Sequence, residues 1–394
     1  MMRTIALIIE RTDVSLGGAE RSILELTEAL RRANVQVTLL TASGEESEGT
    51  IPLCGSGPGR VSFARFEKAL IRHLAEYEYD IVHSTLPFSF CDVYQPRGGS
   101  YPEAMLRNAA SYRNPKMRVW KRWTGWLNWR RTSLMRAERL LCRRCEGTTL
   151  AALSEYVRDQ FVRHYGVPEE RIAVIPNGVQ LHPSVESAKI TEFRGRVRSQ
   201  SDVAEGEDPA IFLFAANNFR LKGLGPLLEA VKRASSWPSA RPIVIAVAGS
   251  GNPGSYLQRA RRLGIGGRVV FLGPVADMQA AIAGCDTAVL PTYYDPASRF
   301  ILEALAAGRP VITTRYNGAA ERIEHQRHGV VLKDPGEIET LATALIRLSH
   351  PDLVRQMSGA IVEDGLREAV SIDRHAEQLT EVYETIYHGI QKHG

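Results

Sequence analysis

Short runs rich in β-branched residues alternate with helical stretches along the whole chain, and this alternation is the strongest constraint on the fold. It is typical of a parallel sheet with helices on both faces. Residues 20–33, for example, place apolar side chains on one helical face and lie between two such runs. The strands expected in the first half of the chain are 4–9, 35–40, 81–83 and 148–153.

A second α/β series fills the other half, with strands expected at 210–214, 243–248, 268–272, 287–290 and 310–313. The polar stretch between the two series has few apolar anchors and is expected to be a linker, whereas the amphipathic end of the chain predicts a terminal helix. The expected organisation is an N-terminal domain over 1–183, a linker over 184–208, a C-terminal domain over 209–370 and a helix over 371–394.

The composition fits two globular domains, because 44% of the 394 residues are hydrophobic. The opening apolar run stops at Glu10 and is too short for a signal peptide, and no run approaches the length of a membrane-spanning helix. We therefore expect a cytoplasmic protein. Cys142 and Cys145 form a CxxC without a second pair or a histidine cluster, so reduced thiols are favoured over a zinc or redox site.

Two loops have the composition of anion sites. Gly17 and Gly18 follow the first strand and open a helix, where the backbone could approach a phosphate, although an ordinary tight turn has the same sequence. Arg220 and Lys222 follow the first strand of the second half, close to Asn218. Cations at that end of a parallel strand would neutralise a diphosphate, and a solvated loop is the alternative.

A third motif runs from Asp295 to Glu303. Two carboxylates eight residues apart cannot share one helical turn, so we expect one on a loop and the other in a helix over 303–308. Unpaired amides at 300–302 could receive a phosphate, and a carboxylate could accept hydrogen bonds from sugar hydroxyls. Alternatively, Glu303 only supplies favourable charge near a helix start.

The segment from Arg107 through Arg144 carries twelve Lys or Arg residues and a single acid, Glu138. A spacing of three residues would place its tryptophans along one helical stripe, and Trp among Lys and Arg is typical of a helix at a membrane surface. Nucleic-acid binding uses the same residue types, and burial of the stripe in a core is a third possibility. The tryptophans are Trp120, Trp123, Trp126 and Trp129.

Together these motifs resemble those of the family 4 retaining glycosyltransferases of GT-B fold, over essentially the whole chain. The similar segments are 17–21, 175–179, 222–223, 247–251, 270–273, and 295–303 followed by 304–312. The resemblance implies two facing Rossmann-like domains with parallel sheets and a C-terminal helix that crosses back to the first. Within the family, residues 92–94 and the basic insertion look most like the glucosyltransferases that extend the heptose core of lipopolysaccharide.

The resemblance implies retaining transfer of a hexose from a nucleotide diphosphate sugar, UDP-glucose or a related UDP-sugar, to a membrane-associated saccharide such as a lipopolysaccharide core. It implies a peripheral protein on the inner face of the cytoplasmic membrane, with no metal, no cofactor besides the nucleotide-sugar co-substrate, and no nucleic-acid partner. Catalytic roles fall to Lys222, Arg220 and Asp295. The donor-binding set adds Gly17, Gly18, Asn218, Leu272, Gly273, Arg299, Phe300, Ile301, Leu302 and Glu303.

By the same resemblance, the donor lies between the domains and is held mainly by the second, with Glu303 on the ribose and Asp295 facing the donor sugar. His83 and Arg97 are the acceptor-side candidates. This sequence departs from the family pattern E-x7-E by having Asp295, Pro296 and Ser298, which implies an altered sugar pocket. The alternatives are a related nucleotide-sugar enzyme with a soluble acceptor or epimerase activity, and a non-catalytic protein that binds sugar nucleotides.

Overall fold

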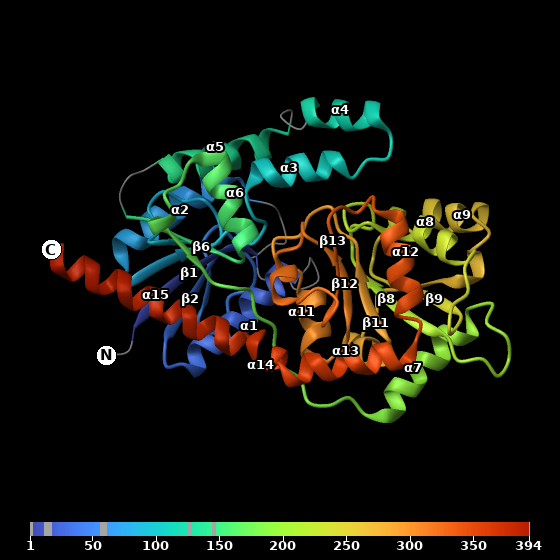
Figure 1. The fold of residues 1–394 in the computed structure, drawn as a ribbon. Helices are drawn as coiled ribbons and strands as arrows, with labels where there is room; N and C mark the ends of the chain where they lie inside the picture. Colours follow the sequence, from blue (N-terminus) through green and yellow to red (C-terminus); the bar gives the residue numbers. More distant parts are fainter. Residues whose placement is uncertain (1–2, 12–17, 56–60, 125–127, 144–146, 394) are drawn as a thin grey trace. The chain divides into compact units, whose positions relative to one another are not determined.

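The computed structural model describes residues 3–11, 18–55, 61–124, 128–143 and 147–393. The chain forms two compact α/β units, each built on its own parallel sheet (Figure 1). The first unit comprises Met1–Ala109, Asn114–Gln180 and Ile372–Gly394, and the second comprises Ala110–Arg113 and Leu181–Ser371.

The sheet of the first unit has seven strands in the order β3-β2-β1-β4-β5-β6-β7, and all neighbouring strands are parallel. Its strand β1, third in this order, is buried from Ile5 to Ile9, as expected for a strand covered on both faces. The strands are β1 (Thr4–Arg11), β2 (Gln36–Ser43), β3 (Thr50–Pro52), β4 (Ile81–Ser84), β5 (Val93–Tyr94), β6 (Thr149–Ala152) and β7 (Ile172–Val174).

The last helix of the chain completes the core of the first unit. Leu379 and Tyr383 of this helix are buried in one cluster with Ile5 and Leu26, so the C-terminal segment returns to the first unit as expected. The helices of this unit are α1 (Gly18–Arg32), α2 (Phe63–Glu76), α3 (Tyr101–Ala110), α4 (Pro115–Thr124), α5 (Trp129–Arg143), α6 (Glu155–Tyr165), η3 (Glu169–Arg171) and α15 (Ile372–His393).

The second unit repeats this topology with six parallel strands in the order β10-β9-β8-β11-β12-β13. Both sheets therefore have the strand order of a Rossmann fold. The strands are β8 (Ala210–Ala215), β9 (Ile243–Ala248), β10 (Val269–Gly273), β11 (Thr287–Leu290), β12 (Val311–Thr314) and β13 (Gly329–Leu332). The helices are α7 (Ser187–Ser199), α8 (Leu224–Ala234), α9 (Gly254–Arg262), η4 (Gly266–Arg268), α10 (Met278–Gly284), α11 (Arg299–Ala306), η5 (Gly318–Arg322), α12 (Ile338–Arg347), α13 (Pro351–Glu363) and α14 (Leu366–Ala369).

The segment 184–208, expected to be a linker, contains helix α7, which packs against α10 and belongs to the second unit. Two buried side chains, Phe193 and Val197, anchor it. Arg194 adds hydrogen bonds to the carbonyl oxygen of Gly284 and to Asp208. The expectation was wrong because two apolar residues and one arginine are enough to dock a helix of this length.

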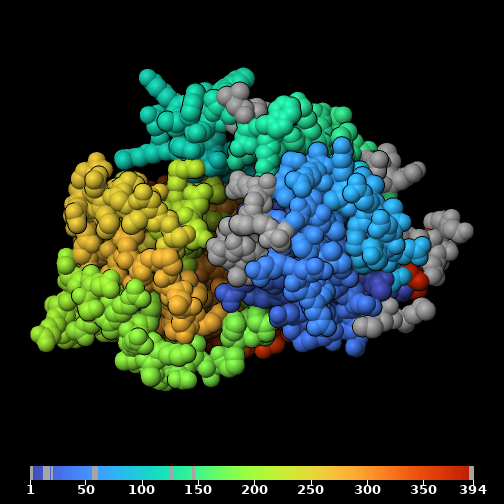
Figure 2. All heavy atoms as spheres, turned by 180° about the vertical axis from the view of Figure 1, so that it is seen from behind, coloured from blue at the N-terminus to red at the C-terminus, as the bar shows by residue number. Residues whose placement is uncertain are grey.

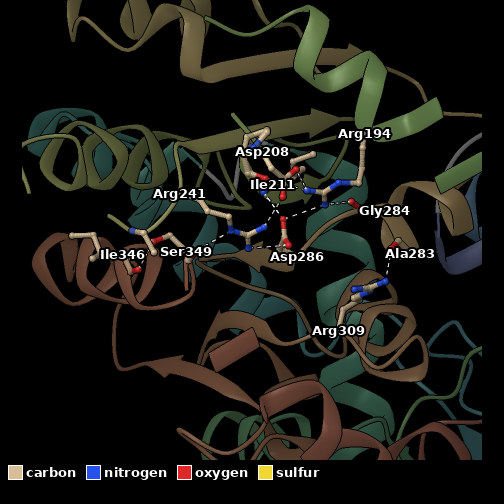
Figure 3. A network of polar contacts seen from close by, with 12 residues as sticks. Arg194, Asp208, Ile211, Arg241, Ala283, Gly284, Asp286, Arg309, Ile346 and Ser349 are labelled. Carbon is tan, nitrogen blue, oxygen red and sulfur yellow. Dashed lines mark hydrogen bonds and ion pairs between the residues drawn. The ribbon is translucent and has the colours of Figure 1, made fainter. Parts of the chain in front are cut away.

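Arg194 belongs to a polar network at the amino-terminal edge of the second sheet (Figure 3). Asp286 accepts hydrogen bonds from Arg194 at 3.3 Å, from Arg241 at 3.0 Å and from the amide of Ile211 at 2.7 Å. Arg241 also donates to the carbonyl oxygen of Ser349. These contacts tie α7, the start of β8 and the end of α12 together.

Candidate functional site

The strand order of the second unit places a topological switch point between β8 and β11. From β8 the chain proceeds outward through β9 and β10, and from β11 it proceeds in the other direction through β12 and β13. In open parallel sheets, ligands bind outside the carboxyl ends of the strands where the order reverses. The loops that follow β8 and β11 carry Lys222 and Asp295, so the sheet brings these two sequence motifs to one place.

Lys222 and Asp295 form an ion pair at this switch point. The Nζ atom of Lys222 lies 2.6 Å from Asp295 Oδ2 and 3.0 Å from the carbonyl oxygen of Tyr294. The Lys222 and Asp295 side chains are 22% and 15% exposed, so both are shielded from solvent while still reachable by a ligand. The pair gives the two loops a shared charged contact.

Gly223 shows how closely these two loops approach each other. Its backbone has φ +84°, and a Cβ atom placed there would lie 1.9 Å from the carbonyl oxygen of Pro291. Only glycine fits this position, on both conformational and steric grounds. Thr292 then donates from its hydroxyl to the carbonyl oxygen of Tyr294 at 2.9 Å, which orients the loop before Asp295.

Helix α11 begins four residues after Asp295, and its first residue is Arg299 rather than the expected Glu303. Ser298 occupies the N-cap position but its side chain makes no capping hydrogen bond. The amides of Phe300 and Ile301 have no partner within the helix because they lie in its first turn. The start of α11 therefore offers N–H groups and the positive end of a helix dipole beside Asp295.

Glu303 lies one turn inside α11 and pairs with Arg299. An Arg299 Nη atom is 3.1 Å from Glu303 Oε1, and both side chains are about nine-tenths buried. Leu302 is 2% exposed and its amide donates to the Ser298 carbonyl oxygen at 3.1 Å, so neither its side chain nor its amide is available to a phosphate. Phe300 and Ile301 are buried in the same way, consistent with a role for their amides rather than their side chains.

Arg220 is held by residues 110–113, which group with the second unit. Its guanidinium carbon lies 3.8 Å from the ring centroid of Tyr112, and it donates to the hydroxyl of Ser111. Stacking on an aromatic ring orients the guanidinium plane and leaves its positive charge available to an anion. Asn218 shapes the same loop, since its Oδ1 atom accepts from the Leu221 amide at 3.1 Å.

The remaining donor-side candidates are dispersed over other strand ends and helix starts. Leu272 is 6% exposed, so its side chain lies in the core, while Gly273 ends β10 and accepts from the Gly249 amide at 2.8 Å. Gly18 is the first residue of α1 in the first unit, and Gly17 lies outside the described residues. The structure therefore brings Lys222, Asp295 and the start of α11 together within one unit.

His83 is not placed as an acceptor-binding residue. It is fully buried, its Nδ1 atom lies 2.5 Å from the Tyr383 hydroxyl, and burial together with Arg97 lowers its pKa to about 3. A neutral histidine inside the core holds α15 to the first sheet instead. Arg97 is half-buried after β5 and donates to Asn177 Oδ1 at 2.9 Å.

The basic segment forms separate helices rather than one continuous stripe. Trp120 and Trp123 lie on α4, which has no buried residue, and are 53% and 75% exposed. Trp129 begins α5 and is 80% exposed, whereas Trp126 lies outside the described residues. In Figure 2 the teal side chains of this region project from the surface. Burial in a core is thus wrong for the three described tryptophans.

None of the described helices is both long enough and apolar enough to cross a bilayer. In the same parts of the chain, no three His, Cys, Asp or Glu side chains are grouped as a metal site would require. Cys142 is buried and reduced, and Cys145 lies outside the described residues.

Four residues of the site were not predicted from the sequence. Ser111 and Tyr112 lie far from Arg220 along the chain, and no local pattern connects them. Thr292 follows an expected strand but carries no motif. Asn317 could have been noticed, because Asn-Gly after an expected strand is a strong turn signal.

The fold defines an α/β protein of two Rossmann-like units. Comparison with known proteins extends this classification: a model described as Glycosyltransferase Family 4 matches residues 16–182, and one described as Glycosyl transferases group 1 matches residues 209–350. The chain belongs to the family 4 glycosyltransferases.

Two curated relatives are an uncharacterized glycosyltransferase of Methanocaldococcus jannaschii and the lipopolysaccharide glucosyltransferase WaaG of Escherichia coli. The first is 24% identical over 241 residues, which are 60% of each chain. The second is 29% identical over 210 residues, which are 53% of this chain and 54% of WaaG. The matches thus span little more than half the length of these relatives.

Solved structures match over a larger part of the chain. A crystal structure of WaaG, described as involved in lipopolysaccharide biosynthesis, has a TM-score of 0.73 at 21% identity and covers 96% of this chain and 99% of its own. Anabaena HepE in complex with UDP-glucose has a TM-score of 0.71 at 17% identity, covering 97% and 100%. These likenesses assign the GT-B fold.

Proposed function

We propose that this protein transfers a hexose, with retention of configuration, from a UDP-sugar such as UDP-glucose to a membrane-associated saccharide. The observation that best supports this proposal is the Lys222–Asp295 ion pair at the switch point of the second sheet, next to the start of α11, where no side chain caps the helix. A cation and helix amides at one strand edge suit a nucleoside diphosphate. HepE, a structural relative, is complexed with UDP-glucose, which supports the choice of donor.

The transfer breaks the bond between the anomeric carbon and the diphosphate oxygen and forms a bond to an acceptor hydroxyl on the same face. The acceptor proton leaves with the diphosphate. Negative charge therefore develops on the leaving group, and Lys222, Arg220 and the amides of Phe300 and Ile301 would stabilise it as preorganised dipoles and cations. Glu303 would accept hydrogen bonds from the ribose, and Asp295 would contact the sugar. The nucleotide sugar is a co-substrate, and the proposal requires no further cofactor.

The proposed acceptor is a saccharide on an anionic membrane, as in the core of lipopolysaccharide. The exposed tryptophans on α4 and α5 lie among cations, and such a surface binds anionic lipid. The relative WaaG is named a lipopolysaccharide glucosyltransferase, which supports this acceptor class. The same surface supports the proposal of peripheral attachment to the inner face of the cytoplasmic membrane, and Arg97 is proposed on the acceptor side.

The test incubates the purified chain with radiolabelled UDP-, GDP- and ADP-sugars, with and without a bacterial membrane extract. We expect label from a UDP-hexose to enter the lipid fraction, and nuclear magnetic resonance of the product to show the donor's anomeric configuration. Label that enters only water-soluble products would indicate the soluble-acceptor alternative. Binding of UDP-sugar without any transfer or hydrolysis would indicate a non-catalytic protein.

A further inference from the structure

One side chain outside the loop that joins β11 to α11 is hydrogen-bonded to the end of that loop. Asn317 follows β12, is 1% exposed, and uses both ends of its amide group. Its Oδ1 atom accepts from the Ser298 amide at 3.0 Å and from the Ala319 amide at 3.1 Å. A single acceptor atom thus ties the residue before α11 to the start of η5.

The other end of the Asn317 side chain is linked through Thr313 to the beginning of the same loop. Its Nδ2 atom donates to Thr313 Oγ1 at 3.0 Å, and the Thr313 hydroxyl donates to the carbonyl oxygen of Leu290 at 2.9 Å. Leu290 ends β11. The chain of hydrogen bonds therefore runs from the end of β11 through Asn317 to the N-cap of α11.

The middle of the loop is paired with the backbone on either side of Asn317. The Asp295 amide donates to the Tyr316 carbonyl oxygen at 2.9 Å, and the Gly318 amide donates to the Asp295 carbonyl oxygen at 3.0 Å. Asp295 in turn contacts Lys222. Both halves of the candidate site, the ion pair and the start of α11, are thus held against the turn that contains Asn317.

We propose that Asn317 is a positioning residue, which sets the start of α11 and the Asp295 loop in the geometry that binds a diphosphate. Ser298 does not cap α11 with its own side chain, so the direction of the first helical amides depends on this external clamp. Asparagine suits the position because it supplies an acceptor and a donor without charge. A carboxylate there would place negative charge beside the proposed anion.

The inference rests on the proposed function, and binding of UDP tests both. Asn317→Ala leaves the Ser298 and Ala319 amides without their acceptor, so we expect about 10-fold or weaker UDP binding by calorimetry and about 100-fold slower turnover, since small displacements of reacting groups have such effects. Asn317→Asp keeps the acceptor for both amides. It loses the donor to Thr313 and buries a charge, so circular dichroism must confirm its fold, and the folded variant should bind UDP more weakly because its charge repels the diphosphate.

The control is Ser349→Ala in the same unit. Ser349 is fully buried, accepts from the Ala240 amide at 3.0 Å and donates to the Ile346 carbonyl oxygen at 2.7 Å, at the edge of the sheet shown in Figure 3. Its loss should lower the melting temperature and leave UDP affinity unchanged. Hydrogen exchange gives a further readout, because UDP should protect residues 298–302 in the wild type and in Ser349→Ala, but not in Asn317→Ala.

Wild-type UDP affinity in both folded Asn317 variants would overturn the positioning role. It would also be overturned if Ser349→Ala weakened UDP binding as much as Asn317→Ala, because the effect would then be one of general stability. A wild-type protein that binds none of the nucleotides would instead refute the proposed function.

Discussion

Lys222 and Asp295 are 73 residues apart in the chain, yet their charged atoms lie 2.6 Å from each other. A lysine ammonium has three N–H donors. Asp295 and the Tyr294 carbonyl oxygen take two of them, which leaves one donor among the contacts that the structure describes. An incoming diphosphate can use this donor and also draw the ammonium away from Asp295, so the pair keeps the cation in place until the ligand arrives.

The charge of Lys222 is the first target for a test. We expect Lys222→Ala to lower turnover by about 100-fold, because hydrogen bonds to charged groups contribute about 1.5–3 kcal/mol and this one strengthens as the leaving group gains charge. Kinetics with UDP-glucose and a membrane extract measure the effect, and circular dichroism checks the fold.

The matched control is Lys189→Ala, which removes an ion pair with Asp277 at 3.4 Å in the same unit. Both of those side chains are about half exposed, so the change should be nearly neutral. A Lys222→Ala enzyme as active as the control would rule out the assigned role.

Glu303 is expected to recognise the ribose rather than the phosphates. Glu303→Gln keeps the shape of the side chain but removes the charge, so UDP binding should weaken by about 10-fold while binding of inorganic pyrophosphate stays the same. Calorimetry with both ligands measures the difference. Glu339→Gln is the control, since Glu339 also pairs with an arginine, Arg233, but at the surface. Equal weakening of both ligands would show that Glu303 acts only by orienting Arg299.

The exposed tryptophans predict membrane binding that is separable from folding. Replacing Trp120, Trp123 and Trp129 together by Ser should weaken binding to phosphatidylglycerol vesicles by at least about 10-fold, because their apolar rings no longer enter the interface. The melting temperature should not fall, since all three side chains are more than half exposed. Vesicle sedimentation measures binding, with Trp237→Ser of the second unit as the control. Unchanged sedimentation of the triple variant would contradict a membrane role.

The buried carboxyl group of Glu138 makes the stability of the first unit depend on pH. Burial raises its pKa from 4.5 to about 7, although the hydroxyls of Tyr165 and Tyr94 donate to its carboxylate. The folded state therefore holds the proton more tightly than the unfolded state. This contribution to stability is present below pH 4.5 and is lost as the pH rises through about 7.

Glu138→Gln should remove this contribution. We expect the free energy of unfolding of the wild type to fall relative to the variant between pH 5 and pH 8 in urea titrations. The buried His83 and His375, whose pKa values are lowered to about 3, act in the opposite sense below pH 6.5, but they are present in both proteins and cancel in the difference. Parallel pH profiles would disprove the assignment.

The long buried strands were predictable because their apolar runs are continuous. Strand β9, for example, was expected at the residues where it occurs. The strands β3, β5 and β7 were missed because runs of two or three residues carry no periodic signal and form only through pairing with a neighbour. Strand β13 was also missed, although β11, which has the same length of four residues, was expected at the residues where it occurs. The start of α11 was expected too late because Arg299 is polar and continues no apolar pattern. Its buried ion pair with Glu303 places it in the helix.

Local motifs indicated Lys222, Asp295 and the amides at 300–301, because each lies after a strand or at a helix start. What the sequence could not show is which side chains fix them. Asn317 lies 19 positions from Ser298, and Tyr112 lies 108 positions from Arg220. Contacts at such separations follow from the topology of the fold and leave no local pattern in the sequence. His83 was misassigned because a polar residue in a strand has the same local signature whether it faces a ligand or a buried tyrosine.

Helix α15 follows the whole second unit in the sequence, yet Leu379 and Tyr383 fill the hydrophobic interior around β1, which precedes that unit. During synthesis, the apolar surface that α15 covers in the first unit stays exposed until the whole second unit has been made. A chain that lacks residues 372–393 should therefore expose the apolar face of the first unit around β1 and bind holdase chaperones there.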